Sequence, residues 1–321
     1  MFSKQKFDFA LLVLLSALLP ISRCAFASEE VLVTDAPVRK DNIQLGMMTN
    51  YRDTSGSFDP YGTYGAYPEG SSVWSVIQIY SIGYRFESPL EVGLTFANRY
   101  SESTFPTGSS QSKSFGSPSL SARYHVAINR ETHLIFHSGF STPFKFSNRR
   151  TAGDPSASMS SDGDLSAPVG APMGGYTLRA GMGVSTTLRS VPMRFSVDAN
   201  IMHAFSSTQP VMDGPNDGLT QTVQRGNQYS LSEGVGYSLS RHWLVSGGVR
   251  QAWSSNTYTD GEEMLGTASR LFSTDVGLTY VALVDWRVTA SYDTQWPFYS
   301  FIVNQPYAPS VSMGLTYTGL Y

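Results

Sequence analysis

The sequence predicts an all-β protein, a transmembrane antiparallel β-barrel of 12 strands with long extracellular loops and short periplasmic turns. Apolar and polar residues alternate with a period of two from residue 43 to the end of the chain, which indicates strands with one apolar face. Many segments run 11 to 14 residues, and a tilted strand of about 13 residues rises roughly 33 Å, enough to cross a bilayer core. The gaps between segments are alternately long and short, as in bacterial outer-membrane barrels.

The predicted strands span, in order, 43–52, 73–86, 90–103, 117–129, 133–143, 175–188, 193–207, 227–240, 242–256, 268–281, 285–295 and 308–320. The long gaps are 53–72, 104–116, 144–174, 208–226, 257–267 and 296–307. The short turns centre on residues 87–89, 130–132, 189–192, 241 and 282–284. Long loops therefore gather at one end of the barrel, and both ends of the barrel segment lie with the tight turns at the other.

Composition excludes several other classes of protein. Charged residues are only 15% of the chain, while it holds 18 tyrosines, 18 phenylalanines and 29 glycines. A β-sandwich rarely keeps all its strands this long, and a propeller would show a self-similar repeat of about 40–50 residues. After the first 27 residues no run of about 18 apolar residues occurs, so no membrane helix is expected.

The N-terminus predicts a signal peptide over residues 1–27. Lys4 and Lys6 precede an apolar run over 9–20, and Ala25-Phe26-Ala27 is a cleavage pattern. We expect 28–42 to be a short periplasmic segment or plug and 43–321 to be the barrel. A lipoprotein is disfavoured because Arg23, rather than a small residue, precedes Cys24.

Removal of this peptide would change both the cysteine content and the charge of the chain. Cys24 is the one cysteine, so no disulfide or zinc–thiolate site is expected. The peptide carries three basic residues and one acidic residue, so the formal charge falls from −3 to about −5. A negative chain argues against binding to nucleic acid.

The two faces of each strand predict which side chains meet lipid. In 193–205 the apolar residues Met193, Phe195 and Val197 alternate with Arg194, Ser196 and Asp198, so the apolar set should face lipid and the polar set the lumen. Aromatic residues at the ends of the apolar faces predict interfacial girdles; they are Trp74, Phe86, Trp243, Trp253, Trp286 and Trp296. The closing strand, with Tyr317 and the terminal Tyr321, resembles the signal that barrel-assembly machinery recognises.

The polar faces give the candidate lumen-lining residues: Arg85, Glu91, Arg99, Arg123, His125, His137, Arg179, Arg194, Asp198, Asn200, Arg250, Asp275, Arg287 and Asp293. One interpretation is a salt-bridged network that fills a narrow barrel. The other is an arginine ladder that attracts anionic solutes. Asp198 lies too far from Arg194 to pair with it, so we expect a partner on an adjacent strand, with Arg179 and Ser185 as candidates.

Glu233 contradicts the pattern, because it falls on the lipid-facing phase between Leu231 and Val235. A bulge near Gly234 or Gly236 would turn it inward, so we expect a register shift there. A functional acid is the alternative hypothesis.

The longest loop, 144–174, is rich in Ser, Gly, Pro, Ala and Asp. It has no core of its own, so it is expected either to narrow the lumen or to lie on the surface. Asp154, Asp162 and Asp164 make only a weak cation site.

Catalysis is weakly supported. The adjacent His137 and Ser138 point to opposite faces of one strand and cannot form a Ser–His pair. His125 and His137 lack an evident carboxylate, so neither a metal nor any other cofactor is expected.

Several stretches resemble the outer-membrane barrels of the "meta-pathway of phenol degradation" or transporter family, which are distantly similar to fatty-acid and aromatic-hydrocarbon channels. The resembling stretches are G-x-P-x-L-x-A-R-Y-x-V (116–126), Ser-Thr-Pro-Phe (141–144), R-G-N-Q-Y-S-L (225–231) and Leu315-Thr316-Tyr317. Members tend to have Pro-Thr-Gly where this chain has Ser-Thr-Pro. The resemblance implies uptake of small, hydrophobic or aromatic molecules.

We therefore expect an outer-membrane channel for passive or facilitated uptake of small molecules, and not an enzyme. The expected partners are the lipid bilayer, lipopolysaccharide, the export and barrel-assembly machinery and a small solute. Two alternatives remain, a non-transporting structural or surface-interaction barrel and a lipid-modifying hydrolase.

Overall fold

The computed structural model describes residues 42–86, 89–106, 108–116, 118–142, 146–153, 176–188, 191–210, 220–283, 285–296 and 302–320. The predicted signal peptide, nearly all of the predicted periplasmic segment, and Tyr321 lie outside these residues, as does loop 144–174 except for residues 146–153. No helix in this part of the chain is long and apolar enough to cross a membrane.

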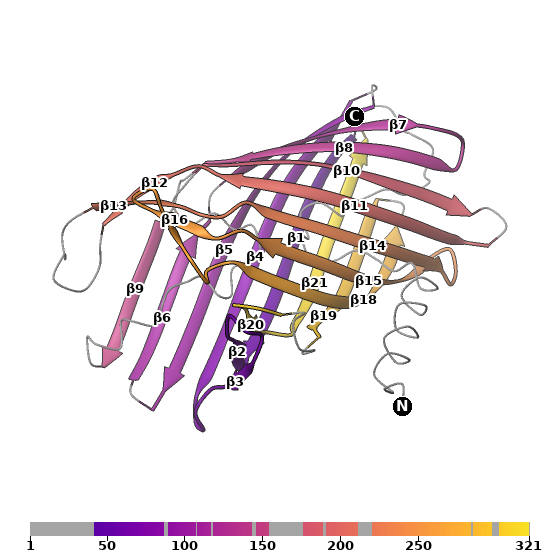
Figure 1. Ribbon diagram of the computed structural model, residues 1–321. Coiled ribbons are helices and arrows are strands. Elements are labelled where there is room, and N and C mark those ends of the chain that lie inside the picture. The colour runs from indigo at the N-terminus through magenta and orange to yellow at the C-terminus, as the bar shows by residue number, and fades with distance from the viewer. Residues whose placement is uncertain are drawn as a thin grey trace, which may run out of the picture.

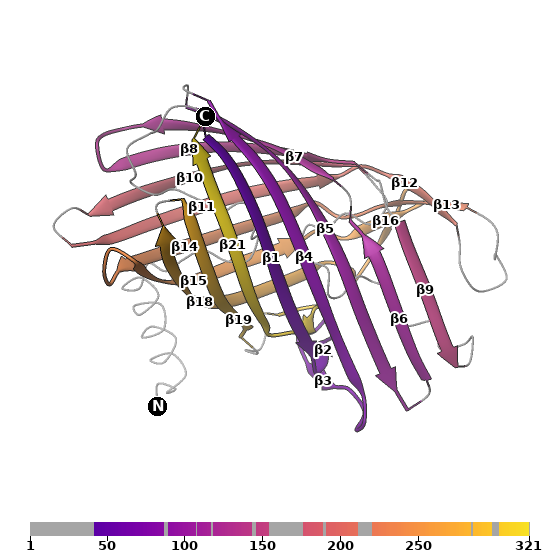
Figure 2. The same cartoon turned by 180° about the vertical axis from the view of Figure 1, so that it is seen from behind.

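Twelve antiparallel strands close into a barrel, which confirms the predicted fold (Figures 1 and 2). They are β1 (Asn42–Thr54), β4 (Ser72–Arg85), β5 (Leu90–Phe105), β7 (Ser119–Ala127), β8 (Thr132–Ser141), β10 (Thr177–Leu188), β11 (Met193–Ala204), β14 (Gln228–Ser238), β15 (Trp243–Ser254), β18 (Ser269–Leu283), β19 (Trp286–Gln295) and β21 (Ser310–Leu320). Each pairs with its neighbours in sequence, and β1 pairs with β21 to close the ring, Asn42 opposite Leu320. Closure leaves no unpaired sheet edge around this ring.

The outer face of the barrel is an apolar belt. Exposed side chains such as Leu45, Met182, Val197, Leu278 and Leu315 lie on this face and are 40–52% accessible. In a soluble protein so large an apolar patch would be a liability. Here it is the surface that meets lipid.

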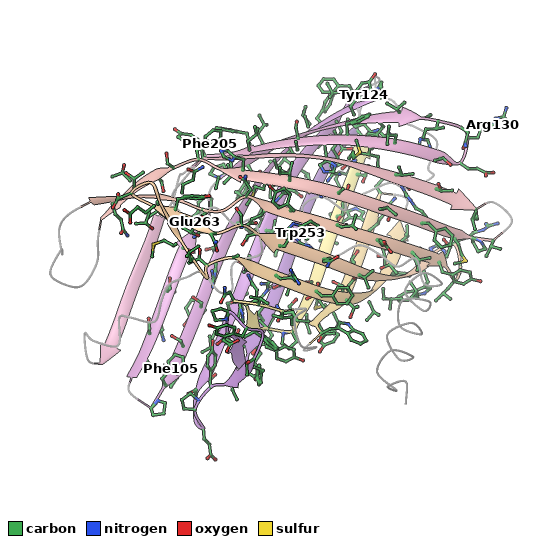
Figure 3. All side chains as sticks on the ribbon, viewed as in Figure 1. Phe105, Tyr124, Arg130, Phe205, Trp253 and Glu263 are labelled. Carbon is green, nitrogen blue, oxygen red and sulfur yellow. The ribbon has the colours of Figure 1, made fainter. Side chains whose placement is uncertain are left out.

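Two rows of aromatic rings border this belt. Towards the long-loop end lie the pairs Tyr51–Trp74, Trp74–Tyr100, Phe140–Tyr176 and Tyr229–Trp253. Towards the tight turns lie Tyr84–Phe86, Trp243–Tyr280 and Trp286–Tyr317. Trp296 follows β19 and donates its indole N–H to Thr274 Oγ1 (2.6 Å). Figure 3 shows Trp253 on the barrel wall, with Arg130 at the tight-turn end and Glu263 at the long-loop end.

The long-loop end carries short strands where the sequence predicted only loops. They are β2 (Gly56–Phe58), β3 (Tyr64–Ala66), β6 (Gly108–Phe115), β9 (Phe146–Gly153), β12 (Ser207–Pro210), β13 (Thr220–Gln224), β16 (Thr257–Thr259), β17 (Glu262–Met264) and β20 (Pro306–Tyr307). The turn between β16 and β17 shows how one of these loops forms a hairpin. Asp260 and Gly261 have φ of 52° and 87°, the left-handed pair of a two-residue hairpin turn, which Asp-Gly favours.

Strands β2, β3 and β20 form a small sheet at the end of β1 (Figure 1). The amide N–H of Phe58 donates to Gln305 O (2.8 Å), and the Val303 and Arg270 backbones bridge to each other. Phe58 is 4% and Ile302 0% exposed. Two distant loops therefore share a compact apolar contact at the mouth of the barrel.

The lipid-facing assignment predicts a depth-dependent effect of charge. Met182→Arg, in the middle of the outer face of β10, should destabilise the barrel by about 2–4 kcal/mol, because an arginine there sits in hydrocarbon. The control Leu188→Arg, at the tight-turn end of the same strand, should cost only about 0–1 kcal/mol. Urea unfolding in lipid vesicles measures both, and equal effects would contradict the membrane placement.

Candidate functional site: the inner face of the barrel

The strand register places every predicted lining residue on the face opposite the apolar belt. Alternation along each strand fixes this face, and the pairings keep the alternation in phase between neighbours. Several of these side chains are deeply buried, including Glu91 (8% exposed), Arg250 (9%) and Asp275 (5%). The inner face is therefore charged and polar along its length.

One cluster lies near the tight-turn end. Glu91 on β5 is 3.6 Å from Arg123 and 3.7 Å from His125, both on β7. Arg85 on β4 is opposite Glu91 in the register. Glu91 thus contacts two basic side chains of the next strand and faces a third on the preceding one.

A second cluster crosses a whole strand. His137 on β8 lies 3.6 Å from Asp198 on β11 and also contacts Asn200, although β10 separates the two strands. Asn200 in turn donates to Asp198.

Two glycines of β10 make this contact possible. Gly181 and Gly183 face inward between His137 and the β11 side chains. A Cβ on Gly181 would lie 2.6 Å from Asn200 Oδ1, and one on Gly183 would lie 2.7 Å from Asp198 Oδ2. These positions must lack a side chain for the cluster to form.

These contacts correct one sequence-based expectation and add to another. Both histidines do have a carboxylate nearby, Glu91 for His125 and Asp198 for His137. Asp198 contacts His137, which lies two strands away. The sequence pattern suggested partners for Asp198 on adjacent strands only. Ser185 instead accepts a hydrogen bond from Arg194 (2.8 Å).

A third cluster, in the long-loop half, was missed from the sequence. Asn50 on β1 donates to Ser310 and Ser312 on β21 (3.1 and 2.7 Å). Its Oδ1 accepts from Arg52 Nε (3.1 Å). The alternation within the predicted strand 43–52 already places Arg52 on the inner face with Asn50, so its last residue carried the signal.

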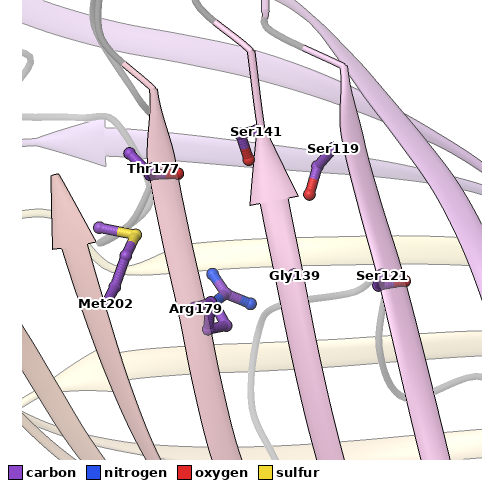
Figure 4. Close-up of a pocket in the computed structure, with 7 residues that line it drawn as sticks. All are labelled: Ser119, Ser121, Gly139, Ser141, Thr177, Arg179 and Met202. Atoms are coloured by element: carbon purple, nitrogen blue, oxygen red, sulfur yellow. The ribbon is translucent and has the colours of Figure 1, made fainter. Parts of the chain in front are cut away.

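A recess opens on the inner face between β7, β8, β10 and β11 (Figure 4). It is small and is lined by Ser119, Ser121, Gly139, Ser141, Thr177, Arg179 and Met202. Four hydroxyl groups and one guanidinium supply hydrogen-bond donors. The chemistry of this set suits an oxyanion.

The described residues support neither a metal site nor a Ser–His pair for nucleophilic catalysis. Within them, no group of three or more His, Cys, Asp or Glu side chains converges on a point. Ser138 pairs with Ala122 and Ala180 on the outer face, whereas the neighbouring His137 faces inward.

Glu233 also departs from expectation. Strand β14 pairs with β11 and β15 without a register shift, placing Glu233 opposite Val197 and Val249. The expected bulge near Gly234 or Gly236 is absent from this strand, so that expectation was wrong. Glu233 lies on the lipid-facing side.

No protein-family model and no curated protein matches the chain. The fold resembles the COG4313 outer membrane channel from Pseudomonas putida F1, with a TM-score of 0.67 and 11% identity over 90% of this chain and 100% of that one. It also resembles the translocator domain of the autotransporter NalP from Neisseria meningitidis, with a TM-score of 0.50 and 10% identity over 88% and 90%. The fold and the apolar belt place the protein in the bacterial outer membrane. The phenol-degradation family is not established for it.

The strand-crossing cluster predicts an unusual sensitivity at Gly181. Gly181→Ala should overlap the His137 ring and Asn200 and destabilise the barrel by about 1–3 kcal/mol. Gly139→Ala is the matched control, since its Cβ would meet nothing closer than 3.5 Å. Unfolding in vesicles and the side-chain NMR signals of His137 would measure the effect, and unchanged His137 signals in Gly181→Ala would show that the cluster does not depend on this glycine.

Proposed function

We propose that the barrel is a channel for passive or facilitated passage of small molecules across the outer membrane. The observation that carries this is the polar inner face, which runs from Glu91 near the tight turns to Arg52 near the long loops. A barrel of twelve strands is intermediate between filled eight-stranded barrels and open porins. A narrow pathway lined by fixed charges fits that size.

The lining favours anionic solutes. The inner faces of the twelve strands carry eight arginines, the seven predicted ones and Arg52, against four acids. Two of those acids, Glu91 and Asp198, are in contact with histidines. A positive excess in a confined polar passage raises the local concentration of anions.

The finer expectation of a hydrophobic or aromatic solute rests on the family resemblance alone. Within the described inner faces of the twelve strands the one Phe, Tyr or Trp ring is Phe105, at the long-loop end, where it packs on Tyr67. Stacking platforms for aromatic solutes are otherwise absent from these faces. Small anions are therefore the solute class that the lining supports best.

A closed, non-transporting barrel is the second candidate. It is favoured by the compact sheet of β2, β3 and β20 at the mouth, with Ile302 fully buried. The structures that the fold resembles are a channel and a translocator domain. A hydrolase assay on phospholipid and lipopolysaccharide would test the remaining, enzymatic alternative.

Planar-bilayer recording separates the first two candidates. The purified protein should conduct, and in a KCl gradient the reversal potential should show preference for chloride over potassium. Absence of conductance, together with absence of solute flux in liposomes, would establish the closed barrel.

The selectivity should depend on inner-face arginines. Arg179→Gln should lower the chloride-to-potassium permeability ratio, since it removes a positive charge from the recess. Lys113→Gln is the control, because Lys113 lies over the outward-facing Tyr100 ring. This substitution removes the same charge, but from outside the passage. Equal shifts in both variants would argue against an arginine-lined pathway.

A further inference from the structure

Glu233 occupies the middle of the lipid-facing belt. It is four residues from Tyr229 and four from Tyr237, the aromatic residues of β14 at the two ends of the outer face. Val197 and Val249 lie opposite it on the flanking strands, and Leu231 and Val235 are its outward neighbours along β14. Between the two aromatic rows it is the one charged side chain on the outer face of the described strands.

The carboxyl group has no partner within the described residues. Gln251, diagonal to it across β15 and opposite Leu231, is the nearest side chain with N–H donors on the same face. Neither side chain makes a hydrogen bond or ion pair with another described residue. Hydrocarbon offers no donor either, so an isolated Glu233 carries an uncompensated cost in the membrane.

The wall around Glu233 is shaped for close approach. Ala199 and Gly247, both outward-facing, lie opposite Leu231 and Val235. Small residues at such positions let backbones of neighbouring membrane proteins come near one another. The amide of Gln251 and the carboxyl group of Glu233 therefore stand near two small residues on the lipid-facing side.

We propose that the outer face of β11, β14 and β15 binds a second copy of this chain, with Glu233 hydrogen-bonded to the partner's Glu233. Membrane proteins of one orientation can pair about a two-fold axis along the membrane normal, and that axis keeps every residue at its own depth. An axis that passes beside Glu233 brings it to its own copy within an isologous interface.

The chemistry is self-complementary. One carboxyl group, protonated, donates its O–H to the other, which remains a carboxylate and accepts it. Two carboxyl groups that share one proton in this way resolve their repulsion. Gln251 supplies further N–H donors beside the pair, so the interface satisfies groups that lipid leaves unsatisfied.

Cysteine cross-linking in proteoliposomes tests the proposal. Because Cys24 is the one cysteine in the chain, a Cys24→Ser variant has no thiol that can be cross-linked. Val197→Cys, beside Glu233, should be joined into a covalent dimer by a short bifunctional maleimide. Val311→Cys is the matched control, since Val311 on β21 is 48% exposed against 46% for Val197 but lies far around the ring.

Two further substitutions in the Val197→Cys background isolate the carboxyl group. Glu233→Leu should lower the cross-linked fraction at least tenfold while the barrel stays folded, as its heat-dependent gel mobility would show. Glu233→Gln, which retains a donor and an acceptor, should restore most of it.

Three results would overturn the proposal. They are equal cross-linking of the Val197 and Val311 variants, no effect of Glu233→Leu, and a cross-linked product whose mass contains a different protein. None of these measurements depends on whether the barrel conducts.

Discussion

The hydrogen-bonding requirement of backbone groups in hydrocarbon governs the rest of this structure. An unpaired N–H or C=O in the bilayer core costs several kcal/mol, so a sheet that spans it must have no edge. The β1–β21 ladder meets that requirement, with eleven paired positions from Asn42 opposite Leu320 to Arg52 opposite Ser310. Closure then forces every strand to divide its residues between two solvents, lipid outside and the enclosed polar passage inside.

That division creates the inner clusters and limits them. Side chains of one strand that face inward are two residues apart, so most contacts must run between strands. Neighbouring strands supply the contacts of Glu91 with Arg123 and His125. The His137–Asp198 contact spans a further strand, and only the absence of side chains at Gly181 and Gly183 allows it. Glycine here acts through the volume it leaves empty and not through backbone freedom.

The alternation of apolar and polar residues made the strands and their faces predictable, because that signal is local to each strand. All twelve barrel strands match predicted segments, and β19 was predicted to within one residue. Contacts across strands were not predictable in this way. Asp198 was matched with candidates from the adjacent strand, and the contact with His137 depends on a pairing order and on two glycines that periodicity does not encode.

The alternation placed Glu233 on the lipid-facing side, and the bulge expected to turn it inward does not form in β14. A sequence rule that forbids charge on a lipid face suggested a bulge, because bulges are the usual way to re-aim one side chain. The unbroken pairing of β14 shows that backbone register prevailed over the preference of a single side chain. A bulge would have interrupted a ladder in hydrocarbon and turned the side chains beyond it towards the wrong solvent, Tyr229 and Leu231 or Val235 and Tyr237. One carboxyl group on the lipid-facing side, which can be protonated or paired, costs less than that, so the strand retains its register and Glu233 stays on that side.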